Sequence, residues 1–237
     1  MATLLINVMG CASFPDDPIE REVFLEANDP FEPMNRAIFA FNIEMDKIIL
    51  EPTALIYRNL IPKSGRNAIG RFLINLQLPS TFVNNLLQFE FKEATSTLFS
   101  FVINTTIGLG GLFDPAGITT REEDLGQTIA SWGIGEGFYL VLPFYGPSSL
   151  RDGLGLVGNM HIDPLRIVLK NSEIKSFNSE KIILEAINDR EATIEDFSSL
   201  RNTSLDLYSA MRSLYRQKRD NDIRNGAPAP NPMFEFD

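Results

Sequence analysis

The chain has 237 residues, 44% of them apolar, and its 21 basic and 31 acidic side chains give a formal net charge of −10. Because a polyanion is repelled by this balance, no nucleic-acid partner is expected. One cysteine and one histidine exclude an internal disulfide and leave too few ligands for the common metal and iron–sulfur sites, so no cofactor is predicted. The composition is that of a folded protein that lacks most familiar sets of catalytic residues.

The cysteine, Cys11, follows a short apolar stretch that ends in Gly10. Such a stretch closed by a small residue is typical of the end of a secretory signal, and a cysteine directly behind it resembles a bacterial lipobox. We therefore predict that residues 1–10 are a signal-peptide remnant, that Cys11 carries a lipid, and that 11–28 form a lipid-anchored tether. The alternative is an N-terminal segment with an unused thiol. Ala12, which is not an aspartate, favours the outer membrane.

A helix is predicted to begin at Asp29, because Asp29-Pro30-Phe31-Glu32 supplies an N-cap, a proline and an early acid. Asn35, Asn42 and Asp46 form a polar stripe along this helix. A separate apolar stripe contains Phe31, Met34, Ile38, Phe41, Met45 and Ile48. Two interpretations stay open: a surface helix with solvated amides, or a helix with one face against lipid and the other against a wet interior.

The next region predicts two helices separated by Pro79, the second capped by Ser80 or Thr81. It is followed by 94–113, twenty residues without a formal charge. That length could span a bilayer, but seven polar side chains and the glycines from Gly108 to Gly111 oppose a span. We predict a glycine-rich re-entrant hairpin that dips into the membrane and returns. A buried helix of a soluble core is the alternative.

Asp124 and Gln127 form a capping box that predicts a short helix ending at Gly133. Between 126 and 150 the only charged side chain is Glu136, and glycines and prolines interrupt many apolar residues. This stretch cannot be one long helix and is too apolar to lie freely in water, so it must be buried in a core or in lipid. A strand is conceivable only at 139–142.

Ser148 or Ser149 is predicted to begin the next helix. After Pro164 the chain becomes strongly charged, and 166–224 is expected to form amphipathic, water-facing helices of the same domain as 29–165. A basic cluster in this region is interpreted as a solvated face; it contains Arg212, Arg216, Lys218, Arg219 and Arg224. The Pro-rich end, 225–237, is predicted to be a disordered tail. The fold class is therefore mostly all-α.

Two motifs match a functional pattern in their residues, but the surrounding sequence does not support that function. Gly153–Gly158 matches the dinucleotide fingerprint, but no strand leads into it, and close helix packing through small residues explains it better. Ser148, Ser149 and His161 are residue types of a hydrolase triad, yet the second glycine of a nucleophile elbow is missing.

Several dispersed blocks carry a family resemblance. In chain order they are Asn28–Asn42, Tyr57-Arg58, Pro62, Asn75-Leu76, Pro79, Asn84, Leu87-Gln88, Asn104–Asp114, Asp124–Thr128, Trp132-Gly133 and Leu142–Asp152. In this order they resemble the MlaA (VacJ) family of outer-membrane lipoproteins over about 28–165. One departure is Gly137-Phe138-Tyr139, where the family has Gly-Pro-Tyr, which changes local loop stiffness.

The resemblance implies a non-enzymatic helical ring in the inner leaflet of the outer membrane, facing the periplasm and held beside a trimeric porin. Its amphipathic channel would take mislocalised phospholipids from the outer leaflet and pass them to a soluble periplasmic carrier. This retrograde transport would maintain lipid asymmetry. Apolar stripes facing lipid and amide, hydroxyl and glycine groups facing a channel suit both ends of a phospholipid.

On this basis we predict that Asn35, Asn42 and Asp46 face the channel or stabilise its first helix. The stretches 94–113 and 126–150 are predicted to form the embedded wall and the channel rim. The glycines expected to shape that wall are Gly108, Gly110, Gly111, Gly133, Gly135 and Gly137.

Two other functions are weighed against transport. One is a lipid hydrolase that uses Ser148 or Ser149 with His161. The other is a structural lipoprotein that braces a porin without passing lipid.

Overall fold

Helices and one short hairpin make up the part of the chain that the computed structural model describes, which is residues 17, 21, 25, 27–170 and 177–228. The expectation of a mostly helical protein is confirmed, with a two-stranded sheet in addition. Cys11 and 1–10 lie outside the described residues, as do most of the predicted tether and tail.

Three helical segments follow one another without a loop: α2 (Glu32–Met45), a π-helical turn η1 (Asp46–Leu50) and α3 (Glu51–Leu60). The predicted start was wrong by two residues, because Phe31 and not Asp29 is the N-cap. The Asp29 side chain is 1% exposed and accepts hydrogen bonds from Asn35, Tyr208 and Arg212. Its carboxylate therefore binds distant parts of the chain and is not available to cap the helix.

The polar stripe of α2 faces the hairpin formed by β1 (Tyr139–Leu142) and β2 (Gly146–Ser149). Asn35 is fully buried; its Nδ2 donates to the carbonyl of Tyr139 at 3.1 Å, and its Oδ1 accepts from the amide of Val141 at 2.9 Å. Two helical turns further along, Asn42 makes the same kind of contact: its Nδ2 donates to the carbonyl of Leu142, and its Oδ1 accepts from the amide of Phe144. Two amides thus bind the strand edge as a neighbouring strand would.

Helix α4 (Lys63–Leu87) is continuous through Pro79, so the predicted break there was wrong. A proline removes one backbone donor from the helix, and here the turns on both sides of it are held by neighbours. Helix α5 (Phe91–Thr106) packs along α4, and Asn75 and Asn85 of α4 donate to the hydroxyls of Thr105 and Thr97 at 2.9 and 3.1 Å.

The predicted N-cap of α6 (Leu125–Ser131) is confirmed, because the Asp124 carboxylate accepts from the amide of Gln127 at 2.9 Å. The reciprocal half of the predicted capping box is not formed within the described structure, since the Gln127 side chain donates to the carbonyl of Glu122 instead. Ser149 likewise caps α7 (Leu150–Ile162), accepting from the amide of Asp152 at 3.1 Å. The strand predicted at 139–142 is β1, which pairs antiparallel with β2.

Helices α6 and α7 pack closely through glycine, as the fingerprint-like segment predicted. Gly155 is buried, and a Cβ atom there would stand 2.5 Å from the amide nitrogen of Gly126. At Gly158 a Cβ would overlap the side chain of Leu125. These contacts explain the small residues without a nucleotide.

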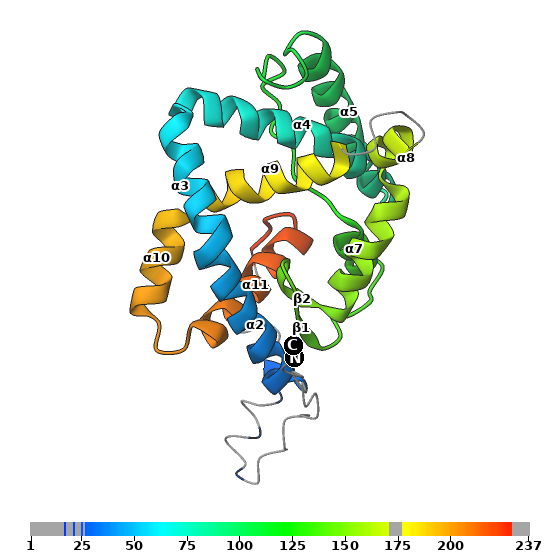
Figure 1. Ribbon diagram of the computed structural model, residues 1–237. Coiled ribbons are helices and arrows are strands. Elements are labelled where there is room, and N and C mark those ends of the chain that lie inside the picture. Colours follow the sequence, from blue (N-terminus) through cyan, green and yellow to red (C-terminus); the bar gives the residue numbers. More distant parts are fainter. Residues whose placement is uncertain (1–16, 18–20, 22–24, 26, 171–176, 229–237) are drawn as a thin grey trace.

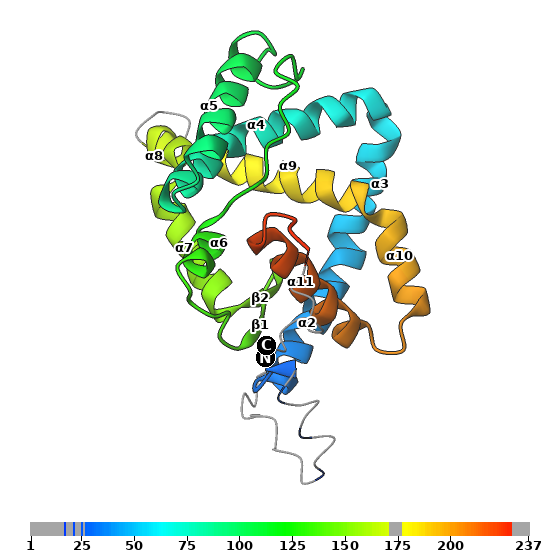
Figure 2. The ribbon, with the colours of Figure 1, turned by 180° about the vertical axis from the view of Figure 1, so that it is seen from behind.

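The charged region folds as α8 (Pro164–Lys170), α9 (Phe177–Ala192), α10 (Ile194–Thr203) and α11 (Leu207–Ile223). In Figures 1 and 2 the segments α2, α3, α4 and α7 and the hairpin follow one another around a centre. Helix α9 crosses beneath α4, and α11 enters the centre from the hairpin side. Helix α5 stands outside this circuit, next to one end of α4.

The basic cluster of α11 is not the solvated face that was predicted. Arg212 pairs with Asp29 at 2.8 Å, Arg216 with Glu136 at 3.1 Å, and Arg219 with Asp124 at 2.7 Å. The side chains of these three arginines are only 14–22% exposed, whereas Lys218 is 80% exposed. The acidic partners are far away in sequence, so helical periodicity could not place them. The arginines attach α11 to the circuit.

We expect Asn35→Ala to lower the free energy of unfolding by about 3 kcal/mol, because it removes the side-chain partner of the buried Val141 amide and Tyr139 carbonyl and one of the three donors to Asp29. Asn42→Ala is the matched control: Asn42 is only partly buried, and water can replace its contacts, so a loss of about 1 kcal/mol is expected. Chemical denaturation of both variants measures the difference. Equal losses would contradict the burial argument.

Candidate functional site

The distribution of polarity is inverted relative to an ordinary globule. Within the described residues, eight hydrophobic side chains are buried, against seventeen polar or charged ones. The same part of the chain exposes thirty-two large hydrophobic side chains. A water-soluble monomer rarely exposes apolar surface on this scale, so the outer face is suited to a non-aqueous or protein environment.

Helix α5 shows this inversion within one element. Its buried residues are Ala94, Thr97, Ser100 and Asn104, whereas Phe99 and Val102 are 59% and 48% exposed. The hydroxyl and amide groups are satisfied by α4 and by the segment after α5. The apolar face is the one without a protein neighbour in the described structure. No helix within the described ranges, α5 included, has both the length and the hydropathy to cross a bilayer.

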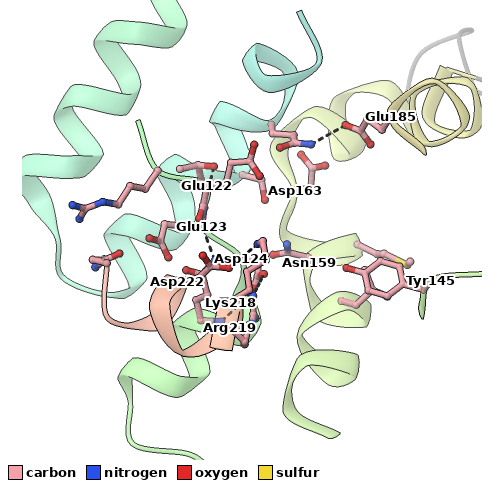
Figure 3. Close-up of a pocket in the computed structure, with 18 of the residues that line it drawn as sticks. Glu122, Glu123, Asp124, Tyr145, Asn159, Asp163, Glu185, Lys218, Arg219 and Asp222 are labelled. Atoms are coloured by element: carbon pink, nitrogen blue, oxygen red, sulfur yellow. Dashed lines mark hydrogen bonds and ion pairs between the residues drawn. The ribbon is translucent and has the colours of Figure 1, made fainter. Parts of the chain in front are cut away.

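A cavity of about 760 Å³ lies on the α7 side of the circuit, bounded by α4, the segment 121–127, α7, α9 and α11. This volume is within the range of small-molecule sites. Its wall is mixed: Tyr145, Leu156, Met160 and Ile182 contribute apolar surface, and charged and amide side chains contribute the rest. Figure 3 shows Glu122, Glu123 and Asp124 opposite Asn159 and Asp163. The cavity therefore offers an amphiphile both kinds of surface.

Most cations at the cavity are neutralised by the protein itself. Arg219 binds Asp124 through two hydrogen bonds of 2.7 Å and reaches Asp152 at 2.8 Å. Although burial opposes it, this guanidinium holds the pKa of Asp124 below its usual value. Lys181 pairs with Glu185 at 2.9 Å. These pairs fix the wall on the α9 and α11 sides.

Glu123 is a buried carboxylate of the cavity wall that has no cation at ion-pair distance among the described residues. Its side chain is 6% exposed, and its Oε2 accepts from Gln88 at 2.8 Å. Burial raises the pKa of Glu123 to about 7, and the hydrogen bond from Gln88 only partly offsets this effect. At neutral pH the cavity thus contains a carboxyl group that readily exchanges its proton.

The three polar residues predicted on α2 and η1 do not line this cavity. Asn35 and Asn42 bind the hairpin, and Asp46 pairs with Arg190 of α9 at 2.7 Å. These contacts are those of residues that stabilise the first helix, which was one of the two predicted roles. Their assignment to a lipid channel stays a prediction.

The predicted glycines at 108, 110 and 111 form the turn that reverses the chain after α5. A Cβ at Gly108 would stand 2.5 Å from two backbone oxygens, and at Gly111 it would overlap Asn75. Gly111 also has a φ of +97°, a conformation that is strained for other residues. The turn can therefore lie directly on α4 because Gly111 has no side chain at the point of contact with Asn75.

The glycines near the hairpin differ from one another. Gly137 has a φ of +71°, and a Cβ there would meet Leu150 at 2.9 Å. Gly133 has a φ of +87° with open space around it, and Gly135 has neither a positive φ nor a close neighbour. None of the six glycines lines the cavity, and their role in a channel wall stays a prediction.

The residues of the hydrolase alternative are not assembled into a triad. Ser148 is buried, Ser149 caps α7, and the His161 ring contacts the carbonyl of Val157 at 2.9 Å. No hydrogen bond joins either serine to His161 within the described structure.

The cavity residues were missed by sequence reasoning. Glu122 and Glu123 were assigned no role from the sequence, and most of the remaining wall comes from α4, α7, α9 and α11. One signal was available: three consecutive acids, Glu122–Asp124, border the charge-poor stretch 126–150. Sequence spacing alone does not show that α11 lies opposite them.

We expect Gly111→Ala to lower the free energy of unfolding by at least about 2 kcal/mol, because the added Cβ meets Asn75 in a left-handed conformation. Gly135→Ala, at an open position, is expected to change it by less than about 0.5 kcal/mol. Thermal unfolding of the two variants in the same detergent measures both. A stable Gly111→Ala protein would show that the turn does not need close contact with α4.

The raised pKa of Glu123 predicts that this group stabilises the fold at low pH and that its contribution is lost as pH rises through about 7. Glu123→Gln removes that loss. The variant is therefore expected to gain up to about 3 kcal/mol relative to the original protein between pH 5 and pH 8. Denaturant titrations at several pH values measure the difference. A constant difference across this range would mean that Glu123 titrates normally.

Comparison with known proteins supplies the family. The model of the MlaA lipoprotein family matches residues 27–222. The intermembrane phospholipid transport system lipoprotein MlaA of Shigella flexneri is 34% identical over 97% of this chain and 89% of its own length. The protein of the same name from Escherichia coli is 32% identical over the same shares. An uncharacterised protein of Rickettsia bellii is 34% identical over 92% of this chain and 80% of its own length.

The fold agrees with these matches. A solved structure from work on the structural basis for maintenance of bacterial outer membrane lipid asymmetry superposes with a TM-score of 0.73 and 32% identity. The match covers 82% of this chain and 98% of the other. The chain therefore belongs to the MlaA lipoprotein family, a family of transport lipoproteins and not of enzymes.

Proposed function

We propose that this protein is an outer-membrane lipoprotein that removes mislocalised phospholipids from the outer leaflet and passes them to a periplasmic carrier. In this proposal the circuit of helices is a ring in the inner leaflet, anchored through Cys11. The cavity is part of an amphipathic channel. The names of the relatives, which place them in an intermembrane phospholipid transport system, support this assignment.

The observation that carries the proposal is the inverted polarity around the cavity. Exposed apolar side chains on α2, α3, α5 and α7 provide an outer surface that lipid tails can solvate. The mixed wall of the cavity provides polar partners for a headgroup, whose burial without them would be costly. A purely structural lipoprotein has no use for such a cavity.

The turn after α5 supports a membrane position for this part of the chain. Ile107, Leu109 and Phe113 in and around the turn are 59–70% exposed, while its backbone is held by Asn75 and Asn104. Non-helical backbone is tolerated in a bilayer where protein satisfies it. We therefore assign 94–113 to a re-entrant element, and the remaining exposed apolar surface to lipid and to a trimeric porin.

The charged helices after Pro164 suit the periplasmic side. Helices α9, α10 and α11 contribute few exposed large hydrophobic residues compared with α5 and α7, and they are joined to the ring by ion pairs. We assign the docking of a soluble lipid carrier to this side.

The test is photo-crosslinking in cells from Met160 and Ile182, which line the cavity, with Leu205 as the control. Leu205 is fully exposed and lies in the connection between α10 and α11. We expect phospholipid adducts from both cavity positions and at least about tenfold fewer from Leu205, because a probe at Leu205 lies on the charged side that we assign to the periplasm, away from lipid. Mass spectrometry of the purified adducts measures this ratio.

Two results would contradict transport through the cavity. One is the absence of lipid adducts at Met160 and Ile182. The other is full rescue of lipid asymmetry, in cells lacking the protein, by a Leu156→Trp variant whose indole fills the cavity.

A further inference from the structure

The unpaired charges of the cavity are predominantly acidic. Six carboxylates and four cationic side chains line it. Lys181, Lys218 and Arg219 each have a carboxylate partner within 2.9 Å, which leaves Arg121 as the cation without one in the described structure. A molecule that enters the cavity therefore meets a surplus of negative charge.

The three carboxylates without a cation at ion-pair distance, again among described residues, are Glu122, Glu123 and Asp163. Glu122 and Glu123 are consecutive in the chain and precede α6. Asp163 lies opposite them at the end of α7 (Figure 3). The free acids thus come from both sides of the cavity, so the surplus belongs to the cavity and not to one exposed loop.

A buried amide in the same wall also lacks a partner. Gln127 is 5% exposed; its Nε2 donates to the carbonyl of Glu122 at 3.1 Å, but its Oε1 accepts from no donor in the described part of the chain. A buried acceptor without a donor is costly and rare. The wall therefore offers carboxylate and amide oxygens to a ligand that brings N–H donors.

An ammonium group fits these requirements better than a metal ion or an anion. An ammonium supplies a positive charge and several donors. The described residues contain no group of three or more acidic, histidine or cysteine side chains that could hold a metal. An anionic group without an ammonium would meet the free carboxylates with only Arg121 to offset them.

We propose that the cavity prefers phospholipids whose headgroup carries an ammonium next to the phosphate over those whose headgroup is only anionic. Glu122, Glu123 and Gln127 receive the ammonium, and Arg121 is the cation available to the phosphate. This inference rests on the proposed function, because it names the class of lipid that the channel carries.

The experiment is native mass spectrometry of the full-length protein in detergent with equal amounts of phosphatidylethanolamine and phosphatidylglycerol that have the same acyl chains. We expect the ethanolamine lipid to be bound in roughly three- to tenfold excess, the size of one charge-assisted contact. The double variant Glu122→Gln/Glu123→Gln is expected to bring the ratio close to one. Glu44→Gln, at a surface acid far from the cavity wall, is expected to keep the original ratio.

Each variant is near-isosteric, and circular dichroism is used to check that it is folded. Glu122→Gln alone changes an exposed side chain and gives an intermediate ratio if the proposal is correct. Glycerophosphoethanolamine, which has the headgroup without the tails, is included as a competitor. Displacement of the lipid by an equal concentration of this compound would assign the site to a soluble amine and overturn the proposal.

The remaining outcomes separate the two proposals. If both lipids bind equally, or if the double variant keeps the original preference, the headgroup inference fails and the transport function stands. A preference for phosphatidylglycerol also overturns the inference. If neither lipid binds the original protein, the proposed function fails and the inference fails with it.

Discussion

The structure depends on placing hydrogen-bonding side chains inside and apolar side chains outside. Amides perform much of this work: Asn35, Asn75 and Asn85 each join one element to another across a buried contact. In a water-soluble protein the exposed apolar surface would favour collapse or aggregation. In a lipid leaflet the hydrophobic effect no longer drives helices together, so buried hydrogen bonds and close packing must hold the fold. The amide contacts and the glycine contact between α6 and α7 meet that requirement.

Ion pairs close the structure from the C-terminal side. Arg190 joins α9 to Asp46, and Arg212 and Arg219 join α11 to Asp29 and Asp124. Each pair connects residues that are far apart in sequence, and most of the partners are well buried. Breaking one partner would leave the other as an uncompensated charge, so such pairs favour one arrangement over others even when their net energy is modest. Of the arginines in these pairs, Arg219 also lines the cavity, where Lys181 and Lys218 are likewise paired with carboxylates.

Transport of an amphiphile places opposing demands on one small protein. The outer surface has to be solvated by lipid tails, while the interior has to accept a charged headgroup and release it again. The cavity has apolar side chains, among them Tyr145, Leu156 and Met160, beside carboxylates and few unpaired cations. Such a wall meets both demands, because it does not fix the ligand by a full set of complementary charges. Membership of a transport-lipoprotein family agrees with such a site.

Local signals in the sequence determined the caps at Asp124 and Ser149, the strand at 139–142 and the helical class, because each depends on neighbours within a few residues. The family resemblance was also readable, since it rests on blocks of consecutive residues. Only the tertiary structure decided that Asp29 binds Tyr208 and Arg212 and does not cap a helix, that α4 continues through Pro79, and that the arginines of α11 are paired. The cavity belongs to this second group. Its wall combines residues from 77 to 226. Charged residues so far apart in the chain become partners only through the packing of the helices, and the spacing of residues in the sequence does not encode that packing.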